Sequence, residues 1–242
     1  MGAPLTPEEV ERGYNNRAAV PDHARFLVEC ASRSAAARQA LAPTLDVRYG
    51  PNAGEVLDVF VPAGPARGTL VFIHGGYWRT LSKNEYSYVA GPMLDEGIAC
   101  VVIDYDLAPR VSVGTIAEEC QRALAWVARH GASHGVSPRN VVVAGHSAGG
   151  HLAALMAATD WTAAGFEAPP LRGALSLSGV HDLTPMLDFS YNADIRLDRA
   201  QARALSPAFM PPRADVPLLL ACGGAETSEF LRQSELMWQA WP

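Results

Sequence analysis

The sequence has few charged side chains and no block of basic ones. Charged residues make up 18% of the chain, and 25 acidic residues outnumber 19 basic ones, for a net charge of −6. Lysine and arginine are scattered along the chain without a run. Because nucleic-acid-binding proteins usually present a cluster of basic residues, the sequence argues against a nucleic-acid partner. Its hydrophobic content of 49% is that of a chain that folds around a core.

Long apolar runs are also absent. The longest candidate, residues 141–158, is interrupted by glycine, serine and histidine, whereas a membrane-spanning helix needs about 20 mainly apolar residues. The N-terminal stretch 1–11 has no basic region followed by an apolar core, which a secretory signal would need. We therefore expect a cytoplasmic protein with no membrane partner.

Cysteine is scarce and dispersed. The four cysteines are Cys30, Cys100, Cys120 and Cys222. No pair has the spacing of metal ligands, so we expect reduced and mostly buried thiols. His130 and His134 are four residues apart, but the glycines beside them favour a fraying helix end over a metal site. The sequence thus predicts neither a metal nor a cofactor.

One motif organises the rest of the chain. A run of valines at 141–143 leads into Gly-His-Ser-Ala-Gly at 145–149, and an alanine-rich stretch follows at 151–158. Strand, sharp turn and helix is the context in which Gly-x-Ser-x-Gly holds a nucleophilic serine, here Ser147. Only glycine leaves room for the backbones that such a turn brings together. The alternative is a structural Gly-Ser turn, but the flanking strand and helix favour a nucleophile.

Hydrophobic patterns predict one α/β domain over residues 1–242. Residues 1–43 form an N-terminal helical arm, in which Thr6 caps a first helix and a second helix spans about 22–41. Further helices are expected at 83–97, interrupted near Gly91-Pro92, and around 116–127, 151–158 and 230–241. Residues 184–212 have no strong period and are a candidate cap segment over a pocket.

Seven strands are expected. Residues 45–49 and 56–61 alternate as in an antiparallel hairpin. Apolar runs typical of strands buried on both faces lie at 69–73 and 99–103, and further strands are expected at the valine run 141–143, at 174–178 and at 216–222. Because helices alternate with these runs, the sequence predicts a mostly parallel sheet with helices on both faces.

The stretch after the first buried strand reads His-Gly-Gly-Tyr-Trp, residues 74–78. Two glycines at this place let backbone N–H groups face a cavity. In a serine hydrolase an oxyanion hole would sit here, with a further donor from Ala148, the residue after the nucleophile. Taken alone, the stretch is equally compatible with a plain turn.

These motifs together resemble the α/β-hydrolase fold and, within it, kynurenine formamidases (arylformamidases) and related bacterial esterases. The matching stretches are residues 74–78, 105–109, 145–150, 178–183 and 226–230. The resemblance covers most of the chain, from about residue 14 onward. The Tyr-Trp after the glycine pair is the more family-specific mark, because many hydrolases share the serine motif.

The resemblance assigns catalytic roles. It implies Ser147 as the nucleophile, with oxyanion donors from Gly75, Gly76 and Ala148. Glu226 falls where the family carries its triad acid, after the seventh strand, although many members have aspartate there. A glutamate is longer but can still orient an imidazole. The local rival for this role is Glu229, one helical turn further on.

The substrate pocket is expected to include Tyr77, Trp78 and His181. The first two follow the glycine pair, and His181 lies after a strand at the edge of the sheet where sites of such folds form.

The chain departs from the family pattern in its histidines. Triad order in this fold is serine, acid, histidine, yet all seven histidines precede Glu226. The resemblance places an eighth strand and the triad histidine after the last helix, so we expect a truncated chain that lacks both. Without a base, a serine hydroxyl is a poor nucleophile. His181 is the best substitute, but a pocket role suits it better than that of the base.

Three functions stay open. The first is a serine hydrolase of tryptophan catabolism that cleaves an aryl formamide such as N-formyl-kynurenine through an acyl-enzyme on Ser147. A small-ester carboxylesterase is the close alternative, because fold and motif do not fix the substrate. The third is a non-catalytic or inactive fragment that keeps the pocket without the base. The expected partner is a small molecule, and an unpaired edge strand would invite homodimers.

Overall fold

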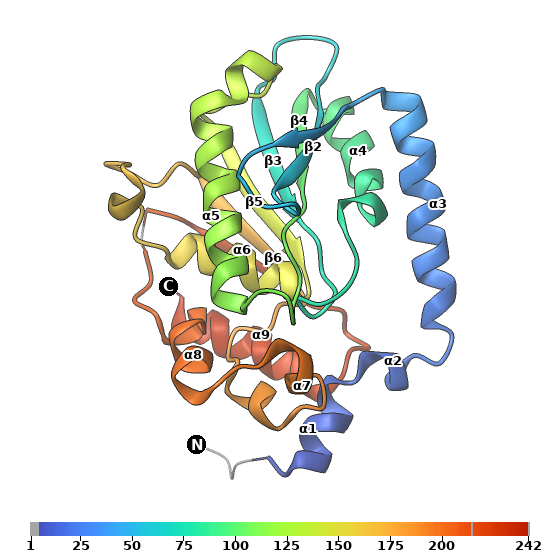
Figure 1. The fold of residues 1–242 in the computed structure, drawn as a ribbon, viewed down its shortest axis with the longest axis vertical. Helices are drawn as coiled ribbons and strands as arrows, with labels where there is room; N and C mark the ends of the chain where they lie inside the picture. Colours follow the sequence, from blue (N-terminus) through green and yellow to red (C-terminus); the bar gives the residue numbers. More distant parts are fainter. Residues whose placement is uncertain (1–4, 214, 242) are drawn as a thin grey trace.

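The computed structural model describes residues 5–213 and 215–241, so the outermost ends of the predicted domain lie outside the described residues. A seven-stranded sheet runs through it in the order β1-β2-β4-β3-β5-β6-β7 (Figure 1). The strands are β1 (Thr44–Arg48), β2 (Val56–Phe60), β3 (Gly68–Ile73), β4 (Ile98–Ile103), β5 (Val141–His146), β6 (Gly173–Leu177) and β7 (Leu218–Ala221). The β1–β2 and β2–β4 pairs are antiparallel and the others parallel, which confirms the mostly parallel sheet.

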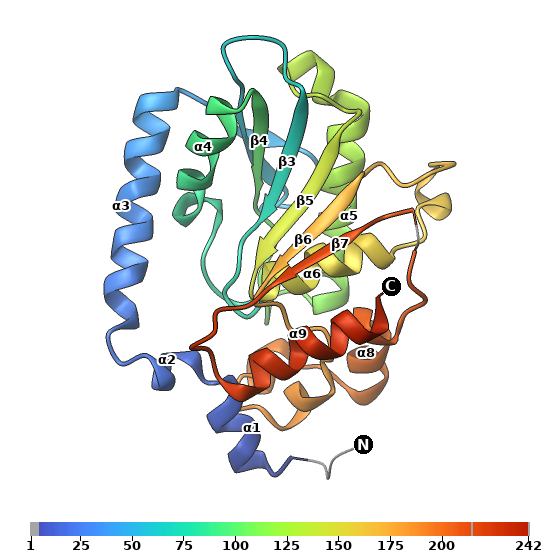
Figure 2. The ribbon, with the colours of Figure 1, turned by 180° about the vertical axis from the view of Figure 1, so that it is seen from behind.

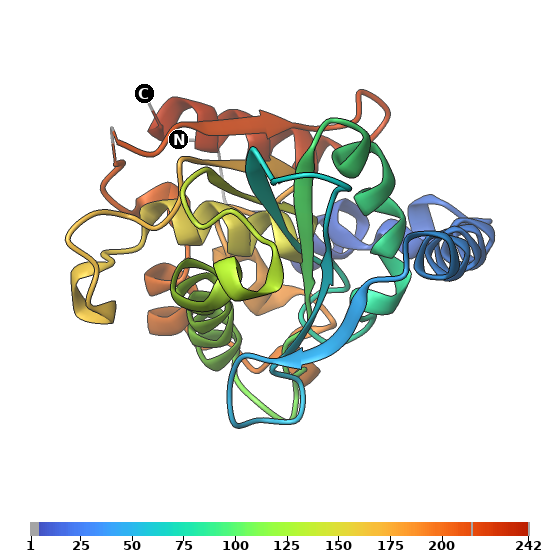
Figure 3. The same ribbon diagram turned by 90° about the horizontal axis from the view of Figure 1, so that it is seen from above.

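Helices cover both faces of this sheet. On one face lie α5 (Val113–His130) and α6 (Ala148–Ala158), and on the other lies α4 (Ala90–Asp95) (Figure 2). Seen from above, α4 (green) separates the sheet from the long outer helix α3 (His23–Leu41, blue) (Figure 3). Successive side chains of β3 point to opposite faces of the sheet. Val71 and Ile73 pack in the core under α5 and α6, and Phe72 packs in the core under α4.

The remaining helices lie beyond the carboxyl ends of the parallel strands (Figure 1). They are α1 (Pro7–Tyr14), α2 (Asn16–Ala19), α7 (Asn192–Ile195), α8 (Arg199–Ala204) and α9 (Ser228–Ala240). Short 3-10 turns connect them, including Thr184–Asp188 and Pro207–Phe209 in the candidate cap segment. In the described part of the chain, no helix is long and apolar enough to cross a membrane.

The predicted start of the arm is confirmed, but one predicted helix is wrong. The side chain of Thr6 accepts a hydrogen bond from the Glu9 N–H at 3.3 Å, and Glu9 accepts one from the Thr6 N–H at 2.8 Å, as a capping box requires. Residues 83–97 instead form two 3-10 turns, Lys83–Glu85 and Ser87–Val89, before α4. Gly91-Pro92 lies within the first turn of α4, where the missing N–H of a proline costs nothing.

A partly buried cluster of ion pairs holds the second half of the arm against the sheet. The ammonium of Lys83 lies 2.7 Å from a carboxylate oxygen of Asp46 and 2.8 Å from one of Asp58. Arg38 of α3 reaches the other oxygen of Asp58 at 2.5 Å. Asp58 is fully buried, so its charge depends on both cations, and this pairing holds α3 in place.

Strand β7 is hydrogen-bonded on one side only in the described part of the chain, where it pairs with β6. Its central Leu219 is 66% exposed, and Trp238 of the neighbouring α9 is 71% exposed. An edge strand with an exposed apolar side chain is a template for pairing with another chain.

We expect the protein to self-associate through β7. Replacement of Leu219 by lysine should lower the concentration-dependent mass measured by light scattering, because a charged edge strand resists pairing. Leu231→Lys on α9, which is 42% exposed but lies off the edge strand, is the matched control. A wild-type monomer at all concentrations would contradict the expectation.

Candidate active site

Ser147 occupies the turn between β5 and α6 in a strained backbone conformation. Its φ and ψ are 57° and −118°, a region that residues with a side chain rarely enter. The N–H of Ser147 donates to the Leu177 carbonyl at 2.8 Å, and its own carbonyl accepts from the His151 N–H at 3.0 Å. These bonds hold the strained turn, as expected of a serine presented for reaction.

Two glycines make this turn sterically feasible. A Cβ atom on Gly145 would lie 2.1 Å from the carbonyl oxygen of Gly149, and a Cβ atom on Gly149 would lie 2.1 Å from that of Ile73. Both distances are far inside van der Waals contact. The crowding predicted from the Gly-x-Ser-x-Gly motif is therefore confirmed.

The glycine pair after β3 lies against the serine turn. A Cβ atom on Gly75 would meet the His146 carbonyl oxygen at 2.7 Å and the Cβ of Ser147 at 3.3 Å. Gly76 has a φ of +113°, and Tyr77 and Trp78 follow with φ of 51° and 57°. Three consecutive left-handed residues turn this loop back on itself, so that its N–H groups can face the cavity beside Ser147.

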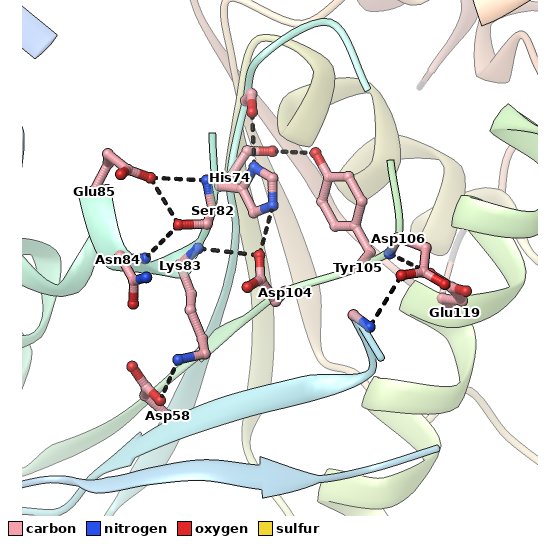
Figure 4. Close-up of polar contacts among 12 residues, drawn as sticks. Asp58, His74, Ser82, Lys83, Asn84, Glu85, Asp104, Tyr105, Asp106 and Glu119 are labelled. Carbon is pink, nitrogen blue, oxygen red and sulfur yellow. Dashed lines mark hydrogen bonds and ion pairs between the residues drawn. The ribbon is translucent and has the colours of Figure 1, made fainter. Parts of the chain in front are cut away.

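A layer of polar contacts supports the loop from beneath (Figure 4). His74 is fully buried, with Nε2 3.1 Å from Asp104 and Nδ1 2.7 Å from the Gly75 carbonyl. Its ring stacks on Tyr105 with centroids 4.1 Å apart, and the Tyr105 hydroxyl donates to the His74 carbonyl at 2.9 Å. The Nδ1 atom of His74 thus helps to position the loop, whereas Nε2 lies near Asp104 without a hydrogen bond among the described residues.

The candidate oxyanion donors differ in their surroundings. The N–H groups of Gly76 and Ala148 have no acceptor among the described residues. Burial raises the pKa of Tyr86, and the backbone of Gly75 opposes this rise. Gly75, Gly76 and Ala148 therefore all remain candidate oxyanion donors beside Ser147.

A cavity of about 520 Å³ opens onto the serine turn. The loop after β3 and Tyr191 line it, but much of its wall comes from the N-terminal arm. The arm residues that line it are Asn16, Arg17, Val20, His23, Phe26 and Leu27. The sequence prediction missed this, although the apolar run at 26–28 of α3 cannot all face one core. The predicted cap 184–212 contributes Tyr191 alone.

Two predicted pocket residues lie in the core instead. Trp78 is fully buried, and its indole N–H donates to His151 at 3.3 Å. His181 is also fully buried, with its ring nitrogens 2.9 Å from the Ser176 hydroxyl and 3.1 Å from the Gln233 carbonyl. Neither residue lines the cavity over Ser147, whereas Tyr77 does.

Burial also makes His181 unsuitable as a base. It lowers the pKa of His181 to about 4 and that of His151 to about 4, because a charged imidazole is poorly solvated in the core. All seven histidines lie in the described part of the chain, and no histidine side chain is hydrogen-bonded to the Ser147 hydroxyl there. His146 borders the cavity beside Ser147, and its surroundings lower its pKa by desolvation, opposed by the charge of Glu226.

The two candidate acids are held differently. Glu226 is half-buried, accepts a hydrogen bond from the Ser178 hydroxyl, and accepts another from the Gly223 N–H at 3.1 Å. Glu229 is 7% exposed and accepts from the Tyr14 hydroxyl at 3.0 Å and from Arg232 at 2.9 Å. Because Glu229 ties α1 to α9, Glu226 is the carboxylate that remains for the site.

Comparisons with known proteins agree with this geometry. The family model BD-FAE matches residues 57–240. A kynurenine formamidase of Salmo salar is 32% identical over an alignment that covers 91% of this chain and 75% of that protein. A solved structure from Silicibacter sp. TM1040, assigned as a thioesterase, is 32% identical with a TM-score of 0.86, covering 96% of this chain and 87% of that one.

A more distant structure supports the fold alone. Esterase B of Lactobacillus rhamnosis is 20% identical with a TM-score of 0.70, over 90% of this chain and 80% of that one. Together with the sheet order and the helix layers, these similarities confirm the predicted α/β-hydrolase fold.

The two buried histidines predict acid sensitivity. Above pH 6.5 both the folded and the unfolded chain carry neutral imidazoles, and stability does not depend on them. Between pH 6.5 and about 4, His151 and His181 become protonated in the unfolded chain but stay neutral in the folded chain. The free energy of unfolding should therefore fall with decreasing pH by up to about 1.4 kcal/mol per pH unit for each histidine.

Urea denaturation at several pH values measures this slope. His181→Gln should reduce it, and the exposed His130→Gln is the matched control. A stability that stays constant between pH 6.5 and 4 in the unmodified chain would rule the explanation out.

Proposed function

This chain belongs to the BD-FAE family of α/β-hydrolases, and we propose that it is a serine hydrolase that cleaves an aryl formamide such as N-formyl-kynurenine through an acyl-enzyme on Ser147. Its relatives place it in the hydrolase class, acting on formamide or ester substrates. The observation that carries the proposal is the strained Ser147, which faces a cavity beside the Gly75-Gly76 loop. A cytoplasmic location and a small-molecule substrate are part of this proposal.

The proposed reaction begins with attack of the Ser147 hydroxyl oxygen on the formyl carbon. The carbonyl oxygen becomes negatively charged and accepts hydrogen bonds from the N–H groups of Gly76 and Ala148. The C–N bond then breaks, the aryl amine leaves with a proton, and a formyl ester remains on Ser147. Water attacks this ester, which releases formate and restores the serine hydroxyl.

Glu226 is proposed as the acid that orients a histidine base. Its hydrogen bonds with Ser178 and Gly223 keep the carboxylate close enough for its charge to act on His146, beside the nucleophile. The proton of the Ser147 hydroxyl needs a base, and no histidine side chain in the described part of the chain is hydrogen-bonded to that hydroxyl. We therefore expect slow turnover, since sites that lack triad members keep roughly 10³- to 10⁴-fold catalysis over water.

Ester cleavage is the second candidate function. The solved relative assigned as a thioesterase is as similar in sequence as the kynurenine formamidase, at 32% identity. Thioesters, esters and formamides share the acyl carbonyl that Ser147 would attack, so the same site suits each of them.

We expect Ser147-dependent hydrolysis of N-formyl-kynurenine at a higher kcat/KM than that of the small aliphatic ester ethyl acetate, because the aromatic and apolar part of the cavity wall can hold an aryl group. Ser147→Ala should abolish both reactions. Product formation measured beside the spontaneous reaction checks this. A preference for the ester would support the second function.

An inactive chain is the remaining alternative. Labelling by a fluorophosphonate reports whether Ser147 is activated, independently of the substrate chosen. Absence of Ser147-dependent turnover and of labelling would contradict the proposal and favour an inactive hydrolase scaffold.

The two glutamates should respond differently to removal of charge. Glu226→Gln should lower kcat by about tenfold or more with little change in thermal stability, because it removes the carboxylate whose charge acts on His146, the neighbour of Ser147. Glu229→Gln should lower the melting temperature, because it weakens the buried bonds with Tyr14 and Arg232. Initial rates and thermal unfolding of both variants test this. The reverse pattern would assign the acid to Glu229.

A further inference from the structure

The permanently charged side chains that line the cavity over Ser147 are both arginines. The ionisable residues of this cavity include Arg17, His23, Arg79 and His146, and no aspartate or glutamate is among the described residues that line it. The chain as a whole carries a net charge of −6. A cavity wall of the opposite sign to the whole chain indicates a ligand with an anionic group.

The two arginines of this wall are not equivalent. Arg79 is engaged, with Nε 2.8 Å from a carboxylate oxygen of Asp194 and its guanidinium 4.2 Å from the ring centroid of Tyr191. Arg17 forms no ion pair within the described part of the chain. Its guanidinium is therefore the cation available to a ligand in the cavity.

The arm positions Arg17 with respect to the reacting serine. Arg17 lies in α2, whose N-terminus is capped by the Asn15 side chain, 3.0 Å from the Ala18 N–H. Just before this turn, the carbonyl of Tyr14 accepts a hydrogen bond from the hydroxyl of Tyr77. Tyr77 follows the glycine pair beside Ser147, so the loop that would bind the oxyanion also anchors the element that carries Arg17.

The rest of the wall is apolar or aromatic. Val20, Phe26 and Leu27 come from the arm, and Tyr77 and Tyr191 face them from the body of the protein. The rings of Tyr77 and Tyr191 are 5.3 Å apart in an edge-to-face arrangement. Such surfaces favour an aryl group, while a guanidinium matches a carboxylate with two parallel hydrogen bonds.

We propose that Arg17 binds a carboxylate on the substrate while Ser147 attacks its acyl carbon, so that the cavity selects aryl acyl compounds that carry a negative charge. The proposal deepens the proposed function and rests on it. Arg17 then determines specificity through binding and takes no part in the chemical step.

Two substrates that differ only in the carboxylate test this: N-formyl-kynurenine and N-formyl-kynuramine. Arg17→Gln should raise KM for the first by about tenfold or more, because a charge-assisted bidentate contact is lost. It should leave kcat for the first substrate and both constants for the second unchanged. Arg17→Lys should recover part of the loss, because it keeps the charge but not the planar fork.

The matched control is Arg12→Gln, since Arg12 lies on the same arm but outside this cavity. An Arg17→Gln variant that changes KM equally for the two substrates, or for neither, would overturn the proposal and leave the proposed function intact.

A binding measurement tests the carboxylate site independently of hydrolysis. Calorimetric titration of the Ser147→Ala protein with the products kynurenine and kynuramine needs no turnover. We expect tighter binding of kynurenine and loss of that preference in the double variant with Arg17→Gln. If Ser147-dependent hydrolysis is absent but the preference is found, the proposed function fails and the carboxylate site stands. Equal binding of the two compounds would refute the site.

Discussion

The close approach of three backbone segments around Ser147 is the constraint on which the site depends. Three backbone segments meet here: the end of β3, the end of β5 and the start of α6. They lie so close together that a side chain at position 145 or 149 would collide with the backbone, so both positions are glycine. This contact forces the serine turn into its strained conformation and brings the Gly75-Gly76 loop against it. The same close contact therefore positions both the nucleophile and the oxyanion donors.

The N-terminal arm is held at both of its ends and crosses the cavity between them. At one end, the buried Tyr14 hydroxyl bonds with Glu229 and accepts from Gln233 at 2.7 Å, which joins α1 to α9. At the other end, Arg38 pairs with the buried Asp58 of the sheet. The residues between these two anchors have few partners of their own, and Phe26 is 45% exposed. Such an arm can shape a ligand site without contributing to the central core.

Polar groups near the nucleophile serve packing as often as chemistry. His74, His151 and His181 all lie close in sequence to reactive motifs, yet each is fully buried and hydrogen-bonded within the core. Burial keeps His151 and His181 neutral at physiological pH. Proximity to a motif in the sequence is thus a weak guide to catalytic function, because tertiary packing buries these three side chains away from the cavity.

Local sequence patterns determined the seven strands, the arm helices and the serine turn. Period-two and continuous apolar runs mark strands, and the glycines at 145 and 149 identify a turn that only they can make. The sequence could not show that Trp78 and His181 are buried, or that Arg17 and Phe26 line the cavity. Those assignments depend on which distant segments meet: the left-handed loop turns Trp78 toward His151, and anchors more than 150 residues away in the chain, in α9, hold the arm over Ser147. Strand patterns are local, whereas the face that a side chain presents to a cavity is set by tertiary packing.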